Sequence, residues 1–236
     1  AAERPDVIFH LAAQSSVAVS WKKPSLTVDV NIKGTLNVLD AVRDCGFSPR
    51  ILLIGSSEEY GPVRPEEVPV KETNPTRPSN IYAVTKNTQN QLGCLYAQAY
   101  GLDILSTRSF NHIGPNQAPI FVVADFCKQV AQIEKGQCEP VLRVGNLSAK
   151  RDFTDVRDVV RAYRLLADRG LSGETYNVGQ GQAVSIEEIL RRILALTEKT
   201  IQVETDPDRL RPVDVPVVEA DIGKLAKVTR IEEGDI

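Results

Sequence analysis

Residues 50–57 read Arg-Ile-Leu-Leu-Ile-Gly-Ser-Ser, an apolar run that ends in a glycine and two serines. The run does not alternate with polar residues, which predicts a strand buried on both faces of a parallel sheet. Similar runs at residues 6–11 and 103–110 predict two more strands of this kind. Between them, apolar residues recur at helical spacing over 28–45 and over 79–100. The order strand, helix, strand, helix, strand is typical of an open α/β sheet with right-handed crossovers.

The segment after residue 115 has a mixed pattern of shorter elements. It predicts helices at 122–135, 156–166 and 185–196, and strands at 141–144, 175–178 and 201–204. The third helix opens with a capping box, Ser185-x-x-Glu188, and Ser79 is expected to cap the helix over 79–100.

These elements predict an α/β fold with two parts. We expect residues 1–115, with part of 141–180, to form a Rossmann-type, doubly wound parallel sheet. Residues 116–236 are expected to form mainly a smaller C-terminal α/β substrate lobe.

A dinucleotide-binding sheet normally opens with a strand, a glycine-rich turn and a helix, followed about 20 residues later by an acidic or basic residue. This sequence contains no such segment and begins where the fourth strand of such a sheet would lie. We therefore expect the chain to lack the first strands and the glycine-rich loop, and to be part of a longer protein. The choice between NAD and NADP stays open, because the residue that decides it follows the second strand.

The composition restricts the classes of function. Of the 236 residues, 42% are hydrophobic and 25% are charged, and the net charge is -3. Such a globular composition offers no basic face for nucleic acid. No apolar run approaches the roughly 20 residues that span a bilayer, and the first residues do not form a signal peptide. We expect a cytoplasmic protein with neither a nucleic-acid nor a membrane partner.

The cysteines predict no metal site. The chain has two histidines and four isolated cysteines, which are Cys45, Cys94, Cys127 and Cys138. No Cys-x-x-Cys pair exists, so a zinc cluster is not expected. Three of the four cysteines fall in predicted helices, and we interpret them as small buried side chains.

Tyr82 and Lys86 are candidate catalytic residues. Their spacing of four residues near the start of a predicted helix places both on one face. An ammonium group beside a phenol stabilises the phenolate, so Lys86 is expected to lower the pKa of Tyr82 toward neutrality. Such a tyrosine can give a proton to a ketone oxygen or remove it in reverse. Taken alone, the pair is equally compatible with an ordinary surface helix.

Ser56, Ser57 and Glu58 strengthen this interpretation. They follow a predicted strand directly, and ligands of open α/β sheets bind outside the carboxyl ends of the strands. A hydroxyl at this position could hydrogen-bond the same substrate oxygen that Tyr82 protonates. The structural alternative is an ordinary polar turn.

Several motifs together resemble the extended short-chain dehydrogenases. They are His-Leu-Ala-Ala-Gln at 10–14, Ser-Ser-Glu-Glu-Tyr-Gly at 56–61, Tyr-Ala-Val-Thr-Lys at 82–86 and Phe-Asn-His-Ile-Gly-Pro at 110–115. Residues 144–153, Val-Gly-Asn-Leu-Ser-Ala-Lys-Arg-Asp-Phe, resemble the GDP-mannose branch of that family. The branch contains dehydratases of GDP-mannose and reductases of GDP-4-keto-6-deoxy sugars, the latter making GDP-rhamnose.

The resemblance implies a role for each candidate residue around an NAD or NADP cofactor. Ser56 would be the active-site hydroxyl, Tyr82 the acid/base, and Lys86 the group that lowers its pKa and holds the ribose. Cofactor contacts would come from Ala12, Ala13, Gln14 and His112. His112 could instead order its loop, and His10, inside an apolar strand, is interpreted as a core histidine.

The resemblance also implies contacts with a GDP-sugar substrate. Asn111 would face the sugar diphosphate, and Arg151, Arg211 and Asp214 would hold the diphosphate and the nucleotide ribose. Arginine suits this task because its fork donates two hydrogen bonds to phosphate oxygens. The structural alternatives are an ion pair for Arg151 and a solvated charged loop for residues 209–212.

Two activities compete within the branch. A dehydratase needs a further acid or base, and Glu58 stands two residues after the catalytic hydroxyl, where the dehydratases carry that glutamate. The sequence at 113–117 reads Ile-Gly-Pro-Asn-Gln instead of the dehydratase pattern Glu-Ser-Pro-Arg-Arg, and 121–126 lacks the dehydratase lysine. Residues 152–158 also look more like a reductase.

We therefore expect reduction of the C4 ketone of a GDP-4-keto-6-deoxyhexose, with GDP-mannose dehydration as the alternative. A non-catalytic fragment or binding protein of the same fold is a third interpretation. The resemblance further implies a homodimer or homotetramer, with the dimer built on the Tyr82 helix and its neighbour.

Overall fold

The computed structural model describes residues 3–209 and 215–229. Within these residues, the central sheet contains four parallel strands in the order β1 (Val7–His10), β2 (Arg50–Ser56), β3 (Ile104–Ser109) and β7 (Thr175–Val178). The helices around this sheet are α1 (Val17–Lys22), α2 (Pro24–Val28), α3 (Gly34–Asp44), α4 (Ile81–Tyr100), α6 (Val156–Arg169) and α8 (Gly223–Thr229). The predicted α/β fold with a parallel sheet is confirmed.

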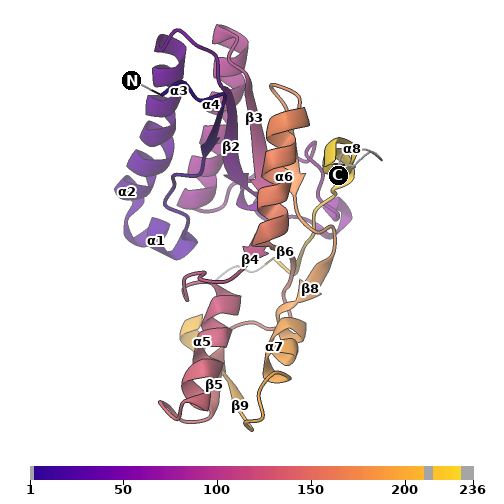
Figure 1. Cartoon of the computed structure of the whole chain (residues 1–236). Coiled ribbons are helices and arrows are strands. Elements are labelled where there is room, and N and C mark those ends of the chain that lie inside the picture. The colour runs from indigo at the N-terminus through magenta and orange to yellow at the C-terminus, as the bar shows by residue number, and fades with distance from the viewer. Residues whose placement is uncertain (1–2, 210–214, 230–236) are drawn as a thin grey trace.

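Different helices cover the two faces of this sheet (Figure 1). On one face, Ile51 and Leu53 of β2 pack against α3 and α4. On the other face, Leu52 packs against Leu166 of α6 and Leu225 of α8. Successive side chains of a strand point to opposite faces, so a strand covered on both sides needs an unbroken apolar run.

The helix predicted over 28–45 is interrupted. Residues Asp29–Lys33 form a π-helical turn, η1, between α2 and α3. This turn holds the buried Asn31, whose Nδ2 donates to the Gln14 carbonyl at 3.1 Å and to Thr85 Oγ1 at 2.9 Å. The turn therefore joins the loop after β1 to α4. Single π turns inside helices are frequent at functional sites.

Two helix starts also differ from the predictions. Helix α1 was not predicted; its first turn is capped by Ser16 Oγ, which accepts from the Val19 backbone N at 3.3 Å. The cap of α4 is Asn80, not Ser79, because Asn80 Oδ1 accepts from the Ala83 backbone N at 2.8 Å.

A second group of elements packs below the central sheet in Figure 1. It contains α5 (Val122–Glu134), α7 (Ile186–Leu194) and a parallel pair formed by β5 (Val141–Val144) and β9 (Gln202–Thr205). Phe126 of α5, Leu142 of β5 and Leu190 of α7 form its core. The helices and strands here lie within a few residues of the predicted ones. Their assignment to a separate substrate domain stays a prediction.

Short strands that the sequence analysis did not predict connect the two groups. They are β4 (Asn111–Ile113), β6 (Lys150–Asp155), β8 (Ala183–Ser185) and β10 (Val217–Val218). β6 pairs in parallel with β4 and β10 and antiparallel with β8. The buried Asp152 of β6 accepts from the backbone N of Gln180 at 2.7 Å, of Gly181 at 2.9 Å and of Ala220 at 3.1 Å. One carboxylate thus joins three chain segments.

The cysteines are less buried than expected. Cys127 and Cys138 are exposed, and Cys45 and Cys94 are half-buried. The prediction of buried cysteines was wrong, because helical periodicity alone does not say which face of a helix meets the core.

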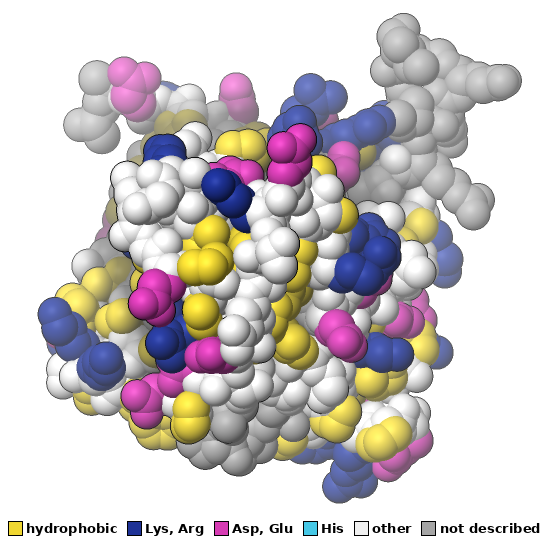
Figure 2. All heavy atoms as spheres, turned by 90° about the horizontal axis from the view of Figure 1, so that it is seen from below, with side chains coloured by type: hydrophobic (Ala, Val, Ile, Leu, Met, Phe, Trp, Pro, Cys, Tyr) yellow, Lys and Arg dark blue, Asp and Glu magenta, His cyan; other side chains and the backbone are white. Residues whose placement is uncertain are grey.

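The surface seen from below carries no single kind of charge. Hydrophobic side chains there lie among basic and acidic ones (Figure 2). Within the described residues, no helix is long and apolar enough to cross a membrane.

Candidate active site

Ser56 lies at the carboxyl end of β2, where the chain turns into the 3₁₀ helix η2 (Ser57–Tyr60). Its Oγ accepts from the Glu58 backbone N at 3.3 Å, and its own backbone N donates to Glu59 Oε1 at 2.9 Å. The side chains of Ser56 and Glu59 thus form a capping box around the first turn of η2. The capping box holds a buried hydroxyl at the edge of the sheet.

α4 supplies Tyr82 and Lys86 from its first turns. Tyr82 is 8% exposed and Lys86 is 3% exposed, and their helix packs against β2 and η2. The Ser56 side chain lies close enough to the Tyr82 phenol to lower the pKa of that phenol. The structure therefore brings the two hydroxyl groups together at the carboxyl end of β2.

The pKa of Tyr82 differs from the prediction. Burial raises this pKa to about 12, and the nearby Glu58 and Glu59 add to the shift, while the Ser56 side chain opposes it. The predicted lowering by Lys86 is wrong for this structure, because the Lys86 ammonium is directed elsewhere. Its Nζ donates to the Ile54 carbonyl at 2.6 Å and to Gln89 Oε1 at 3.1 Å. Tyr82 is therefore a neutral phenol that carries a proton to donate.

Lys86 has a shifted pKa of its own. Burial lowers the pKa of its ammonium to about 8, and the negative charge of Glu59 opposes the shift. A group with this pKa changes its charge close to physiological pH.

Glu58 connects this cluster to a pocket of about 510 Å³. Its carboxylate is half-buried and accepts from Asn80 Nδ2 at 2.9 Å, through Oε2. Ser57, the neighbouring candidate, is half-buried and opens η2 without lining the pocket. Of the three consecutive candidates, only Glu58 reaches the pocket wall.

Asn111 of β4 and Arg151 of β6 also line this pocket. Asn111 is exposed and lies opposite Phe153 in the register of the two strands. Arg151 donates from Nη1 to the Lys150 carbonyl at 2.8 Å and to the Val215 carbonyl at 2.7 Å. An amide and a guanidinium group thus share the pocket with Glu58.

The remaining wall of the pocket comes mainly from the second group of elements. It includes Phe121, Phe126, Asn146 and Arg209, and Arg209 donates from Nη1 to Asp125 Oδ2. His112, next to Asn111 in β4, is exposed and does not line this pocket. The predicted substrate residues Arg211 and Asp214 lie outside the described residues.

The loop after β1 holds the predicted cofactor residues. Ala12 is exposed, and Ala13 and Gln14 are half-buried. The Gln14 side chain is engaged within the loop, because its Nε2 donates to the Ser16 carbonyl and to Thr27 Oγ1, each at 3.0 Å. His10, interpreted as a core histidine, is 6% exposed, and its Nε2 lies 3.0 Å from Thr35 Oγ1.

Three polar residues around the site were not predicted from the sequence: the buried Asn31 and Glu59, and the half-buried Arg108. Glu59 is fully buried and forms an ion pair with Arg108 of β3 at 3.1 Å. Two signals were available in the sequence. Ser56-x-x-Glu59 matches a capping box, and Arg108 is a charged residue inside an apolar strand. Within the described residues, no group of three or more metal-ligating side chains could hold a metal ion.

A family model described as GDP-mannose 4,6 dehydratase matches residues 1–230. The chain belongs to this family. This result confirms the resemblance to the GDP-mannose branch that the sequence motifs indicated.

Members of the family with different activities are similar to this chain. The GDP-6-deoxy-D-mannose reductase of Pseudomonas aeruginosa is 37% identical over 209 residues, which cover 89% of this chain and 69% of the relative. The GDP-mannose 4,6 dehydratase of Homo sapiens is 34% identical over 200 residues, which cover 84% of this chain and 53% of the relative. The chain thus spans about half the length of that dehydratase.

Solved structures of nicotinamide-dependent nucleotide-sugar enzymes have the same fold. The structure of RMD from Pseudomonas aeruginosa complexed with NADPH has a TM-score of 0.92 at 34% identity, covering 97% of this chain and 76% of that one. Thermus thermophilus UDP-glucose 4-epimerase in complex with NAD has a TM-score of 0.82 at 33% identity, covering 95% of this chain and 71% of that one. Both nicotinamides therefore occur among the similar structures.

Proposed function

We propose that the protein reduces the C4 ketone of a GDP-4-keto-6-deoxyhexose. The observation that carries this proposal is the buried Tyr82 beside Ser56 at the carboxyl end of β2, next to a pocket lined by Glu58, Asn111 and Arg151. The similarity to a GDP-6-deoxy-D-mannose reductase supports the choice of substrate.

The two hydroxyl groups have complementary tasks in this reaction. Reduction adds a hydride to the ketone carbon and a proton to its oxygen. Tyr82 holds that proton at the pH of the cell, since the pKa of its phenol is about 12. One lone pair of Ser56 Oγ accepts from the Glu58 backbone N. Its O–H, which favours the Tyr82 phenolate in the absence of substrate, can turn to donate to the ketone oxygen. Together they stabilise the charge that develops on this oxygen.

The residues beside Tyr82 fit a nicotinamide cofactor, which supplies the hydride when it is bound. Ala12, exposed just after β1, has no side-chain atom beyond Cβ that would close this edge of the sheet. An ammonium group has three N–H donors, and Lys86 uses two of them on Ile54 and Gln89. The third is available for a ribose hydroxyl.

The pocket walls suit a sugar nucleotide. Arg151 offers a guanidinium group for phosphate oxygens, and Asn111 offers an amide for the sugar diphosphate. Phe121 and Phe126 add apolar surface. The volume of about 510 Å³ lies in the range of small-molecule sites.

GDP-mannose 4,6-dehydration is the second candidate function, because Glu58 lines the pocket. A carboxylate at this position could remove the C5 proton of the sugar, which a simple reduction does not require. The alternative predicts a loss of dehydration in Glu58→Gln. The reductase predicts that this variant keeps its ketone reduction.

One assay separates these functions. The protein, expressed from its whole reading frame, is incubated with GDP-mannose and, separately, with GDP-4-keto-6-deoxymannose plus NADPH. NADPH consumption with the keto sugar alone supports the reductase. Formation of keto sugar from GDP-mannose without net cofactor change assigns the dehydratase. Absence of both reactions contradicts the GDP-sugar assignment and favours a non-catalytic protein of this fold.

We further infer that the protein works in the cytoplasm as a homodimer or homotetramer. Exposed apolar side chains on α4, namely Val84, Leu95 and Tyr100, support an interface on that helix. Val84 and Leu95 are eleven residues apart, close to three helical turns, and so lie on one face.

A further inference from the structure

An ion pair between the buried Glu59 and the half-buried Arg108 lies directly behind Ser56. Glu59 is fully buried, and its carboxylate accepts hydrogen bonds from three N–H donors within the described residues. Oε1 accepts from the Ser56 backbone N at 2.9 Å, and Oε2 accepts from Arg108 Nε at 3.1 Å and Asn90 Nδ2 at 3.2 Å. A carboxylate that meets only donors is suited to its ionised form. Burial raises the pKa of Glu59, and Arg108 opposes that shift.

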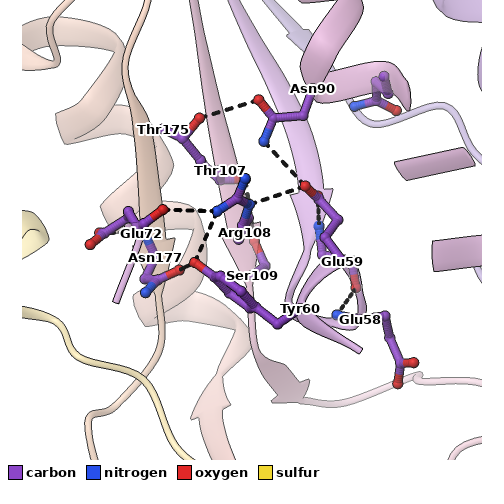
Figure 3. A network of polar contacts seen from close by, with 12 residues as sticks. Glu58, Glu59, Tyr60, Glu72, Asn90, Thr107, Arg108, Ser109, Thr175 and Asn177 are labelled. Atoms are coloured by element: carbon purple, nitrogen blue, oxygen red, sulfur yellow. Dashed lines mark hydrogen bonds and ion pairs between the residues drawn. The ribbon is translucent and has the colours of Figure 1, made fainter. Parts of the chain in front are cut away.

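Arg108 is held from several sides (Figure 3). Its Nη1 donates to the Tyr60 hydroxyl and to the Glu72 carbonyl, each at 3.2 Å, and its guanidinium lies 4.8 Å from the centroid of the Tyr60 ring. The Tyr60 hydroxyl donates in turn to Asn177 Oδ1 at 2.6 Å. The cation is therefore fixed by η2, by the loop that holds Glu72 and by β7.

Asn90 ties the same carboxylate to the Tyr82 helix. While its Nδ2 binds Glu59, its Oδ1 accepts from Thr175 Oγ1 of β7 at 3.2 Å. One carboxylate thus meets groups from β2, β3 and α4. Ser56 comes from β2 and Tyr82 from α4, so the network links the two elements whose hydroxyl groups must meet.

The Glu59 carboxylate fixes the position of the Ser56 backbone. A β-carbon added at Gly55 would lie 2.5 Å from Glu59 Oε1 and 2.2 Å from the Thr107 carbonyl. The carboxylate therefore packs against the backbone of Gly55 while it binds the peptide N–H of Ser56. The position of the serine backbone sets the direction of its short side chain.

We propose that Glu59 and Arg108 are positioning residues that hold Ser56 against Tyr82 in the geometry required for proton transfer to the substrate. This inference rests on the proposed function, because it assigns a catalytic use to the Ser56 and Tyr82 hydroxyl groups. Glu59 is fully buried and binds the Ser56 backbone N, and Arg108 binds Glu59, so both act through Ser56 and not on the substrate.

The charge of Glu59 affects the pKa of neighbouring groups, and a purely structural role would leave these pKa values unchanged. Its negative charge raises the pKa of Lys86, which burial otherwise lowers to about 8, and also raises the pKa of Tyr82. The other ionisable groups around Glu59 are Arg108 and Tyr60, with Cys94 on α4. Neutralising Glu59 removes the negative charge that opposes the effect of burial on Lys86, so the pKa of Lys86 falls further.

The first test is Glu59→Gln in the protein expressed from its whole reading frame. The amide keeps the shape of the side chain, but its single oxygen can serve either Ser56 or Arg108 and not both. We expect kcat for the keto sugar to fall about 10- to 100-fold, with KM changed by less than about twofold. The pH at which kcat falls on the alkaline side of its profile should be lower than in the wild-type protein. Carbon-13 NMR of lysine Cε should also give a lower pKa for Lys86.

Glu188→Gln is the matched control. Glu188 of α7 is also bound by arginines, Arg191 at 2.8 Å and Arg192 at 2.8 Å, but on the protein surface. It should keep the wild-type kcat and pH profile. A Glu59→Gln protein with a kcat within about twofold of wild type and an unmoved pH profile overturns the proposal.

A second variant separates positioning from folding. Breaking one half of a buried ion pair is strongly destabilising, whereas replacing both halves with apolar residues of similar volume is often neutral. The double variant Glu59→Leu with Arg108→Met is therefore expected to fold, with a circular dichroism spectrum like that of wild type, and to lose turnover. A folded double variant with normal kcat contradicts the inference.

Ser56→Ala distinguishes this inference from the proposed function. A wild-type rate of keto-sugar reduction in Ser56→Ala removes the catalytic use of Ser56, and the positioning role of Glu59 and Arg108 fails while the proposed reduction stands. Absence of keto-sugar reduction in the wild-type protein contradicts the proposed function itself. If Ser56→Ala loses turnover while both Glu59 variants keep it, only the positioning role is overturned.

Discussion

Glu58 and Glu59 are neighbours in the chain, yet their carboxylates face different surroundings (Figure 3). Glu59 points into the protein toward Arg108, whereas Glu58 points away from that network and lines the pocket. The 3₁₀ turn of η2 separates the two directions, since consecutive residues of such a helix lie about 120° apart. Glu58 therefore faces the pocket, whereas Glu59 contacts the Ser56 backbone from the interior of the protein.

Tyr82→Phe tests the proton donor. The variant keeps the ring that fills the buried space but lacks the hydroxyl that carries the proton. We expect turnover of the keto sugar to fall by about 10²- to 10⁴-fold, the usual range for a lost general acid. Binding of the sugar nucleotide, measured by calorimetry, should stay unchanged. A variant with a normal rate contradicts the assignment of Tyr82.

Lys86 predicts how activity depends on pH. Because burial lowers the pKa of its ammonium from 10.5 to about 8, the charged form is present below that pH and is lost above it. The charged form makes the stronger hydrogen bond to a ribose hydroxyl. We expect kcat to decline as the pH rises through about 8, measured with the keto sugar at saturation. A rate that stays level up to pH 10.5, the ordinary lysine pKa, shows that the charge is not needed.

At the scale of elements, the junction between β2 and η2 decides where the site lies. The strand ends at Ser56 and the turn begins at Ser57, with the Ser56–Glu59 capping box closing the junction. β3 passes so close behind that position 55 has no room for a side chain. The geometry of the hydroxyl therefore depends on three adjacent elements and not on Ser56 alone.

Gly55→Ala tests this close approach. Its methyl group would lie 2.2 Å from the Thr107 carbonyl, so the backbone must shift. Overpacking of this kind costs about 1–3 kcal/mol, and the shift also moves Ser56. We expect a lower midpoint in urea unfolding and a lower kcat. Gly34→Ala is the control, because its nearest contact would be an ordinary 3.9 Å to Asp29 O in a helical backbone, and it should not destabilise the protein.

At the scale of the whole molecule, Asp152 joins the strands that connect the two groups of elements. Its carboxylate accepts three backbone N–H groups from segments far apart in sequence. The amide of Asp152→Asn has one acceptor oxygen and would point an NH₂ group at the remaining donors. We expect a loss of about 1–3 kcal/mol in unfolding free energy, measured by urea titration. Asp168→Asn, at an exposed position, is the control and should change the unfolding free energy by less than about 0.5 kcal/mol. An equal effect of the two variants would refute this account of Asp152.

The proposed dimer is also a prediction for the whole molecule. Val84 is 46% exposed and Leu95 is 58% exposed on one face of α4. Charges buried in an interface without partners are costly, so Val84→Glu with Leu95→Glu should give a monomer in light scattering. Leu196→Glu, at an apolar residue that is 87% exposed on the other group of elements, should leave the assembly intact. A dimer that survives the double substitution places the interface elsewhere.

The sequence by itself determined the central sheet and the main candidates. Unbroken apolar runs indicated parallel strands, because a strand covered on both faces needs apolar residues at every position. The place of Ser56 at a strand end, and the spacing of Tyr82 and Lys86 on one helix, were readable because they depend only on local periodicity. The family motifs extended these signals to the GDP-mannose branch.

Only the tertiary structure decided the rest. The strands β4, β8 and β10 have two or three residues each, too few for a period to appear, and they exist because distant segments pair. Glu59 and Arg108 are 49 residues apart, so the capping-box pattern could indicate the carboxylate but not its cation. The predicted direction of the Tyr82 pKa shift was wrong for the same reason. Burial and the direction of the Lys86 ammonium set that shift, and both arise from packing between elements that no local pattern encodes.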